Sequence, residues 1–206
     1  MSMTNKEEFI ALLKATDRDG IDYVIEDLEA WGFFEAPASK KNHMCYPGGL
    51  VEHSLNVYHA AMMLKNGLMD RRGDVMESIP DDSIAIATLL HDVCKSRIYR
   101  RVSRKVKNEI GMWETVEDYN IDYSDLPVGH GEKSVILLLS SGLLLNDDEI
   151  CAIRWHMGAW DLAFQSSETV GSINKARDLY PLVGLVQTAD TVAANLIERK
   201  SLAGKI

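Results

Sequence analysis

The sequence has few of the residues that mark extracellular, fibrous or disordered chains. Its 206 residues include three cysteines, five prolines and 14 glycines. An odd number of cysteines in no recognisable pattern indicates a reducing compartment rather than a disulfide scaffold. Because 46% of the residues are hydrophobic, the low proline and glycine content favours one globular domain with a sizeable core and excludes a collagen-like or long disordered chain.

Long apolar runs and a leader segment are also missing. The longest apolar stretch, 135–145, is interrupted by Ser140, Ser141 and Gly142, and it is shorter than the roughly 20 residues that a membrane helix needs. The first eight residues contain no apolar signal-peptide region. We therefore expect a cytoplasmic protein without membrane contact.

Positive charge is in deficit, since 22 Lys and Arg stand against 31 Asp and Glu and the formal net charge is −9. General nucleic-acid binding is not expected, because it depends on neutralising phosphates. The basic residues are nevertheless concentrated in one place. Seven of them, with no acidic residue between them, lie from Lys95 to Lys107.

Most of the chain has the apolar spacing of helices. Thr4 and Glu7 form the pattern of a capping box, Gly67 is placed to end a helix, Asp81 or Asp82 to begin one, and Pro181 suits a first helical turn. The segment 83–95 is nearly all apolar, which is typical of a helix buried at the centre of a domain. The expected helices are 4–15, 21–31, 50–66, 83–95, 130–141, 147–157, 172–179 and 181–200.

One segment departs from this spacing. Residues 99–123 are rich in β-branched and aromatic residues and have the turn sequence 108–111 at their middle, which predicts a β-hairpin. The predicted fold is therefore all-α with a small inserted hairpin at about 98–123. We expect a single domain, 1–206, in which N-terminal helices at 4–32 precede a helical core at about 45–200.

Several polar residues interrupt apolar helical segments. A lone histidine in such a place is usually satisfied by a backbone carbonyl, but here there are several, and carboxylates accompany them. A carboxylate in a buried helix needs a partner, and a metal ion would supply one. His43 lies in a polar loop and His59 faces away from His53 on its helix, so neither is expected to bind a metal. The residues concerned are His53, His91, Asp92, His130, His156 and Asp190.

The order and wording of these residues resemble the HD-domain superfamily of metal-dependent phosphohydrolases. Residues 91–95 (HDVCK) are similar to the HD-x-x-K signature, 47–54 (PGGLVEHS) to the first-histidine segment, and 187–190 (QTAD) to the helix of the last aspartate. Residues 129–134 (GHGEKS) and 154–158 (RWHMG) resemble small stand-alone HD hydrolases of bacteria and their phages. The accessory domain of the related exoribonucleases is missing.

The resemblance implies a ligand set and a mechanism. His53, His91, Asp92 and Asp190 would hold one metal, and Asp92 would bridge to a second metal held also by His130 and His156. Imidazole and carboxylate ligands suit Fe, Mn, Ni, Co or Zn, with Mg possible, and one or two such ions would activate the attacking water. Asp92 and Lys95 would be the catalytic residues. Lys95 would contact phosphate, although a lysine at a helix C-terminus can also simply face the helix dipole.

Other residues near these motifs carry weaker predictions. Lys133 and Arg154 are expected to assist phosphate binding. Arg100 and Arg101 either pair with acidic residues across the hairpin or belong to a lid that steers an anionic substrate. Cys94 is expected to pack as a small apolar side chain. The tryptophans at 113, 155 and 160 are expected in the core rather than stacked on a base.

Three function classes remain open at this point. The leading hypothesis is a phosphatase or phosphodiesterase that acts on a nucleotide or another small anionic phosphorylated substrate. The same ligands occur in di-iron oxygenases of this superfamily, and a non-catalytic nucleotide-sensing module is a further alternative. A nuclease for short oligonucleotides is disfavoured by the acidic charge balance. The sequence specifies no oligomeric state.

Overall fold

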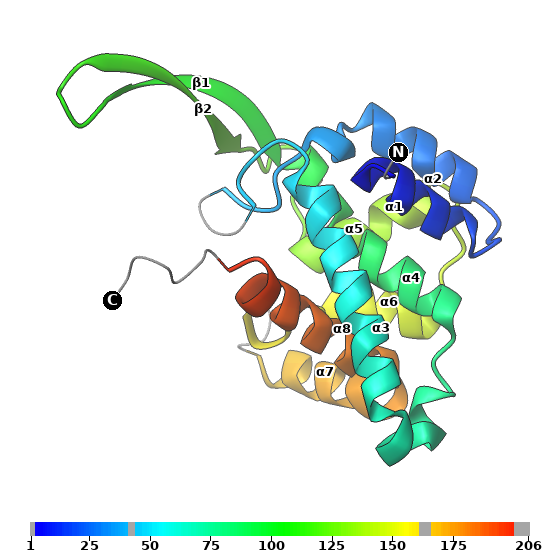
Figure 1. Cartoon of the computed structure of the whole chain (residues 1–206). Helices are drawn as coiled ribbons and strands as arrows, with labels where there is room; N and C mark the ends of the chain where they lie inside the picture. The colour runs from blue at the N-terminus through cyan, green and yellow to red at the C-terminus, as the bar shows by residue number, and fades with distance from the viewer. Residues whose placement is uncertain (1–2, 41–43, 161–165, 200–206) are drawn as a thin grey trace.

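The computed structural model of the chain describes residues 3–40, 44–160 and 166–199, and its body is helical (Figure 1). Helix α1 (Asn5–Lys14) begins at the predicted capping box, in which the Thr4 hydroxyl accepts from the Glu7 backbone N–H. Helix α2 (Ile21–Ala30) and the short 3-10 helix η1 (Phe33–Glu35) follow. The rings of Phe9, Phe33 and Phe34 lie 5.1–5.7 Å apart and join α1 to η1.

Three helices form the centre of the body. Helix α3 (Gly49–Met76) packs against α4 (Asp81–Leu90) and α8 (Pro181–Val192), and α4 also contacts α8. Every residue from Ser83 to Leu90 is buried, which confirms the expectation of a central apolar helix. Pro181 occupies the first turn of α8, as predicted.

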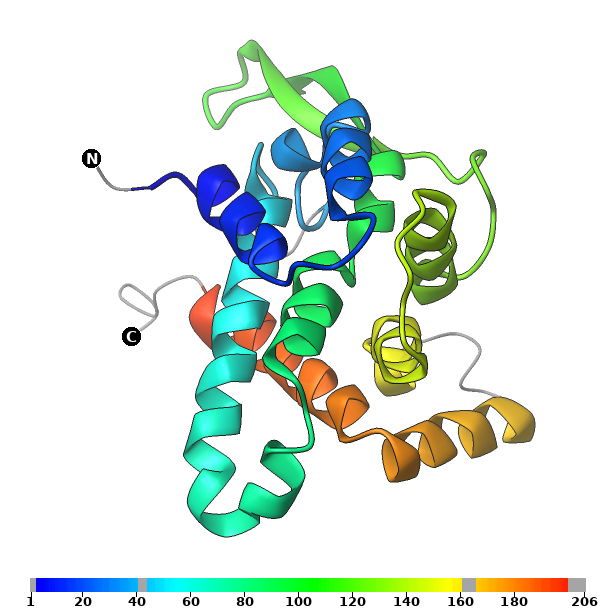
Figure 2. The same cartoon turned by 90° about the vertical axis from the view of Figure 1, so that its right-hand side faces the viewer.

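The remaining helices line one side of this centre. Figure 2 shows α5 (His130–Ser140), α6 (Asp147–Trp155) and α7 (Ser167–Leu179) in succession, with α8 returning from α7 toward α3. Short helical turns follow α4, α6 and α8: the 3-10 helices η2 (Val93–Arg97) and η3 (Gly158–Trp160), and the π-helix η5 (Ala193–Ile197).

The predicted β-hairpin projects from the body (Figure 1). Strand β1 (Tyr99–Lys107) pairs antiparallel with β2 (Trp113–Ile121), and Gly111 takes a φ of 80° in the turn between them. Three arginines of the hairpin face carboxylates: Arg101 lies 2.6 Å from Glu117, Arg104 2.5 Å from Asp118 and Arg100 3.7 Å from Asp122. The all-α fold with one small hairpin is confirmed.

Two predicted helix boundaries around the centre are wrong. Helix α3 does not end at Gly67, because this glycine is not in the left-handed conformation of a helix C-cap and the helix continues to Met76 with a kink at Arg72. Helix α4 begins at Asp81 after Pro80, so neither Asp81 nor Asp82 is the N-cap.

The other differences lie at helix ends. Helix α4 stops at Leu90 because Asp92, with φ −110° and ψ 17°, leaves the helical region. Helix α7 begins earlier than predicted, since the Ser166 hydroxyl accepts from the Thr169 N–H and caps it. Among the described residues, no helix combines the length and apolarity needed to cross a membrane.

Candidate metal centre

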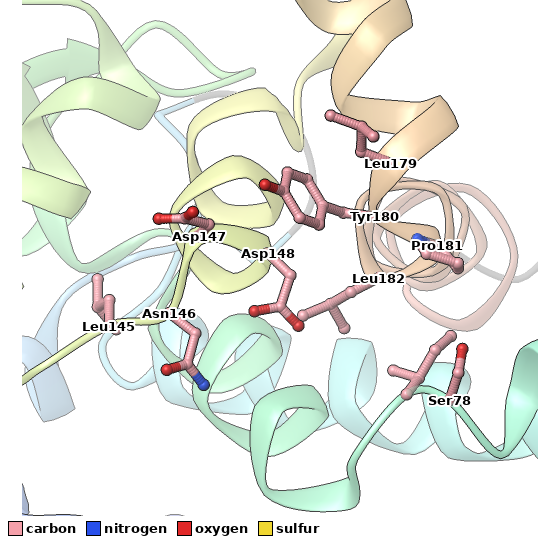
Figure 3. Close-up of a pocket in the computed structure, with 10 residues that line it drawn as sticks. Ser78, Leu145, Asn146, Asp147, Asp148, Leu179, Tyr180, Pro181 and Leu182 are labelled. Atoms are coloured by element: carbon pink, nitrogen blue, oxygen red, sulfur yellow. The ribbon is translucent and has the colours of Figure 1, made fainter.

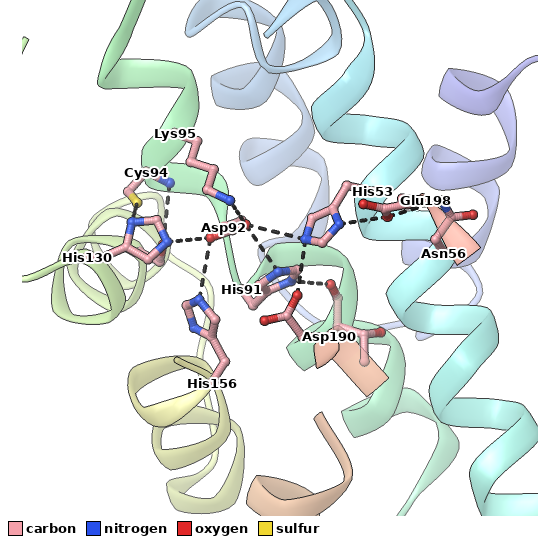
Figure 4. Close-up of polar contacts among 12 residues, drawn as sticks. His53, Asn56, His91, Asp92, Cys94, Lys95, His130, His156, Asp190 and Glu198 are labelled. Carbon is pink, nitrogen blue, oxygen red and sulfur yellow. Dashed lines mark hydrogen bonds and ion pairs between the residues drawn. The ribbon is translucent and has the colours of Figure 1, made fainter. Parts of the chain in front are cut away.

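Six residues predicted as metal ligands converge at one place in the structure (Figure 4). They come from five parts of the fold: His53 from α3, His91 and Asp92 from the turn after α4, His130 from the first residue of α5, His156 from the residue after α6, and Asp190 from α8. They form three overlapping groups, and within each group the ligand atoms lie within 4.8 Å of one another. The groups are His53 with His91 and Asp92, His91 with His156 and Asp190, and Asp92 with His130 and His156.

Asp92 is the centre of this arrangement. Its Oδ1 lies 2.5 Å from His130 Nε2 and 3.5 Å from His156 Nε2. Its Oδ2 lies 3.3 Å from His91 Nε2 and 3.6 Å from His53 Nε2. Each carboxylate oxygen thus faces two imidazoles.

The donor atoms fit divalent metal ions. The Nδ1 atoms of His91 and His156 lie 2.7 Å from the carbonyl oxygens of Thr88 and Ile153, so each Nδ1 donates and each Nε2 carries a lone pair. Both Nε2 atoms are buried, have no hydrogen-bond partner among the described residues, and face the Asp92 carboxylate. Lone pairs turned toward a carboxylate are stabilised by a cation between them.

Charge within the cluster keeps both carboxylates ionised. Burial raises the pKa of Asp92, but Lys95, His91 and His130 outweigh it and hold the pKa well below its usual range. For Asp190, burial is likewise outweighed by the hydrogen bond with His53, so the pKa is lowered. Burial lowers the pKa of His53, but hydrogen bonds to Asp190 and Glu198 raise it to about 9.

A carboxylate that sequence reasoning missed supports His53 from behind. Glu198 Oε1 lies 2.9 Å from His53 Nδ1 and accepts a hydrogen bond of 3.1 Å from the Asn56 amide, and its side chain is fully buried. An oxygen acceptor in this position orients a ligating imidazole and makes it more basic. The available signal was an acidic residue eight positions after Asp190, in a segment predicted to be helical.

Cys94 contacts a predicted ligand as well as packing in the core. It is fully buried, as predicted, and burial raises the pKa of its thiol to about 12. Its Sγ also lies 3.0 Å from His130 Nδ1. The expectation that Cys94 packs as a small apolar side chain is confirmed, and the contact with His130 adds to it.

Lys95 contacts the predicted ligands through a turn. The predicted helix 83–95 would place His91 and Lys95 on one helical face, but α4 ends at Leu90, and the turn of η2 instead brings the ammonium against Asp92 Oδ2. Burial lowers the pKa of Lys95, but Asp92 outweighs it and the net shift is upward. Lys95 therefore places a fixed positive charge beside the predicted ligands.

A cavity of about 1260 Å³ opens onto this cluster. Five of the six predicted ligands line it, all except His91, together with Lys95. Its walls further include aromatic and polar side chains from the 38–46 segment, the hairpin base, η3, α7 and α8. These are Tyr46, Tyr99, Tyr123, Trp160, Arg177 and Gln187, among others.

Comparison with known families agrees with this geometry. The sequence profile described as HD domain matches residues 50–195, a range that contains all six predicted ligands and the hairpin. The chain belongs to the HD domain family. One curated relative is the dihydroneopterin 2',3'-cyclic phosphate phosphodiesterase of Methanocaldococcus jannaschii, which is 32% identical over 94 residues. These residues cover 46% of this chain and 34% of that protein, so the match spans about a third of the relative's length. No solved structure matches the chain.

Four other predicted substrate contacts of this HD domain have partners away from the cavity. The Lys133 ammonium is buried against the backbone carbonyl of Asp125. Arg154 lies 2.5 Å from Glu132 and 3.8 Å over the Trp155 ring. Arg100 and Arg101 face carboxylates of the hairpin segment. Lys95 is the predicted substrate contact that lines the cavity.

The tryptophans partly contradict the sequence predictions, whereas His59 agrees with them. Trp113 and Trp160 are 67% and 86% exposed, so their predicted place in the core is wrong, and Trp155 is partly buried. Both exposed rings lie outside the helical packing, Trp113 at the far end of the hairpin and Trp160 at the cavity. His59 is exposed and lies 2.8 Å from Glu8, away from the ligands as expected, while His43 lies outside the described residues.

A second pocket of about 630 Å³ lies at the start of α6 and α8 (Figure 3). It contains two carboxylates, of Asp147 and Asp148, with Tyr180 and Pro181 opposite them. None of the predicted ligands or substrate contacts lines it. The cluster of six predicted ligands and the larger cavity beside it are therefore the candidate functional site of the HD domain.

Proposed function

We propose that this HD domain is a metal-dependent phosphohydrolase that cleaves a phosphoester bond of a nucleotide or another small phosphorylated substrate. The observation that carries the proposal is the Asp92 carboxylate, set between two pairs of imidazoles at the wall of a cavity that also contains Lys95. Family membership and a phosphodiesterase relative support a metal-dependent phosphohydrolase in general.

The residues assigned to the metals follow the ligand pattern that the family resemblance implies. His53, His91, Asp92 and Asp190 would hold one ion, and Asp92, His130 and His156 a second. Two of the groups of donor atoms support this division, His53 with His91 and Asp92, and Asp92 with His130 and His156, and Asp190 Oδ1 lies 3.3 Å from His53 Nε2. Their mixture of imidazole and carboxylate suits Fe, Mn, Ni, Co or Zn, and Mg less well. Such ions, when bound, lower the pKa of water and stabilise negative charge on phosphoryl oxygens.

The protein's own contribution is positioning and charge. Asp92 and Asp190, both ionised, keep the imidazole nitrogens turned toward the ligand positions. The Lys95 ammonium lies at the cavity wall and is placed to bind a phosphate oxygen of the substrate. We assign Asp92 and Lys95 as the catalytic residues.

The test is metal analysis of the purified protein, followed by hydrolysis assays with Mn, Ni, Co and Mg. The panel holds nucleoside monophosphates, sugar phosphates, and 2',3'-cyclic phosphates, the last because the relative acts on one. We expect Asp92→Asn to lose both metal and activity. We expect Lys95→Gln to keep its metal and lose about 100-fold or more in kcat/KM, the cost of removing one charged stabilising group. Lys14→Gln, an exposed charge on α1, is the matched control.

Two outcomes would replace the proposal. Oxygen uptake by an iron-loaded protein that hydrolyses nothing in the panel would indicate the di-iron oxygenase alternative. Nucleotide binding with neither hydrolysis nor oxygen uptake would indicate a sensing module.

A further inference from the structure

Arg177 lines the cavity beside the predicted ligands, and its side-chain partner there is an amide rather than a carboxylate. It lies in the last turn of α7 and is partly buried, and its Nη2 donates a hydrogen bond of 2.5 Å to Gln187 Oε1 of α8. Both side chains line the same cavity as His53, Asp92 and Asp190. The two residues therefore form a connected pair on the cavity wall.

Among the described residues, no carboxylate compensates the charge of Arg177. Several other arginines pair with carboxylates, as Arg18 does with Glu149, Arg97 with Asp125 and Arg104 with Asp118. Arg177 has no carboxylate within 4.0 Å among the described residues, and its partner there is a neutral amide. A partly buried charge is costly without a counter-ion, so this position favours an anionic group from a ligand.

The Arg177–Gln187 pair lies close to the predicted metal ligands. Gln187 precedes Asp190 by three residues on α8, so the two residues share a helical face and are separated by about 4.5 Å along the axis. Gly158, two residues after His156, has a φ of +53°, and a Cβ atom at this position would overlap the Gln187 amide. Glycine here leaves the space that the Arg177–Gln187 pair occupies.

We infer that Arg177, held by Gln187, is a second anion-binding position in the substrate cavity. The inference rests on the proposed function: the phosphoester lies at Asp92 and Lys95, and a second anionic group of the same substrate lies at Arg177, on the wall of the same cavity. The substrate class is thus a small phosphoester that carries a further phosphate or carboxylate. The volume of about 1260 Å³ accommodates such a molecule.

Binding of two non-hydrolysable probes to the Mn-loaded protein tests this inference by calorimetry. Propylphosphonate has one anionic group, and propane-1,3-diphosphonate has the same chain with two. We expect the wild type to bind the diphosphonate about 10- to 100-fold more tightly, the range that one hydrogen bond to a charged group contributes. Arg177→Gln should remove this preference and leave propylphosphonate binding unchanged.

Two further variants separate charge from folding. Gln187→Glu retains Arg177 and neutralises it in place, so it should also abolish the preference. Lys175→Gln removes an exposed charge from the same helix and should keep the preference. The inference is overturned if the wild type binds both probes equally, or if Arg177→Gln weakens both by the same factor.

The probes also separate this inference from the proposed function, because they contain no bond that a phosphohydrolase cleaves. If the wild type prefers the diphosphonate, loses this preference in Arg177→Gln, and hydrolyses nothing, the anion-binding position stands and the hydrolase assignment falls. If the wild type hydrolyses a substrate but shows no preference for the diphosphonate, the hydrolase assignment stands and the anion-binding position falls.

Discussion

Each histidine of the metal centre has one ring nitrogen turned toward Asp92 or Asp190 and the other turned outward. The outward nitrogens of His91 and His156 meet backbone carbonyls, and that of His53 meets the Glu198 carboxylate. The outward nitrogen of His130 meets the sulfur of Cys94 instead. Because a thiol is a weak acceptor, His130 is the least well supported of the four imidazoles.

This difference predicts unequal metal positions. Cys94→Ala should weaken the position formed by Asp92, His130 and His156 by about tenfold, the lower end of the effect of removing an outer partner. The position formed by His53, His91, Asp92 and Asp190 should keep its affinity. Titration of the metal-free protein with Mn, monitored by calorimetry under reducing conditions, measures both.

Cys94→Ser replaces the thiol with a hydroxyl, which is a stronger acceptor. This variant should therefore preserve or increase the metal affinity of the position formed by Asp92, His130 and His156. Cys151→Ala, which changes a partly buried thiol outside the cluster, is the control. Equal weakening of both positions by Cys94→Ala would show that the thiol supports packing alone.

Sequence reasoning could name the predicted ligands at this scale but not the residues that contact them. The predicted ligands are polar residues in apolar segments, and their order resembles a family motif. Glu198 is 145 positions from His53 and Cys94 is 36 from His130, and no local spacing relates either pair. Such contacts depend on how helices pack, which also explains why no cavity role was predicted for Arg177.

At the scale of elements, the type of each segment was easier to predict than its ends. Gly67 lies inside α3 because the apolar pattern continues beyond it, with Met69 and Val75 packed against the core. Gly48, by contrast, has a φ of 83° and lies at a helix boundary, directly before α3. Whether a glycine marks a helix boundary is therefore decided by its conformation and by the packing of the residues around it.

The contact between α5 and α6 requires Gly131. A Cβ atom at this position would overlap the Arg154 carbonyl oxygen of α6, which is backbone and cannot move aside easily. Gly131→Ala should therefore destabilise the protein by about 1–3 kcal/mol, the usual cost of overpacking, despite the better helix propensity of alanine. Chemical denaturation measures the change.

Gly171→Ala is the matched control, since this glycine of α7 has no atom near its Cβ position. Here the propensity gain should stabilise the protein, by up to about 1 kcal/mol. Because His130 precedes Gly131 and His156 follows α6, Gly131→Ala should also weaken metal binding. Equal stability changes in the two variants would contradict the close contact.

For the whole molecule, the candidate metal centre is the point where distant segments meet. Its six residues come from α3, the turn after α4, α5, the end of α6 and α8, whereas the hairpin contributes none of them. The hairpin arginines pair with nearby carboxylates. Arg177, which lines the cavity and has an amide partner, belongs to the helical body. A ligand at the centre therefore stabilises the packing of the helical body as a unit.

Metal removal should lower the stability of the entire fold. The folded protein presents assembled donors that the unfolded chain does not, so a metal at 100 times its Kd adds about 2.7 kcal/mol. At about 2–4 °C per kcal/mol for a chain of this size, EDTA should lower the Tm of the Mn-loaded protein by roughly 5–10 °C. Asp190→Asn should lose most of this difference, whereas Asp74→Asn, which changes an exposed pair with Arg72, should keep it. A Tm that does not respond to EDTA, in protein shown to contain metal beforehand, would mean that the ion is not held by the buried cluster.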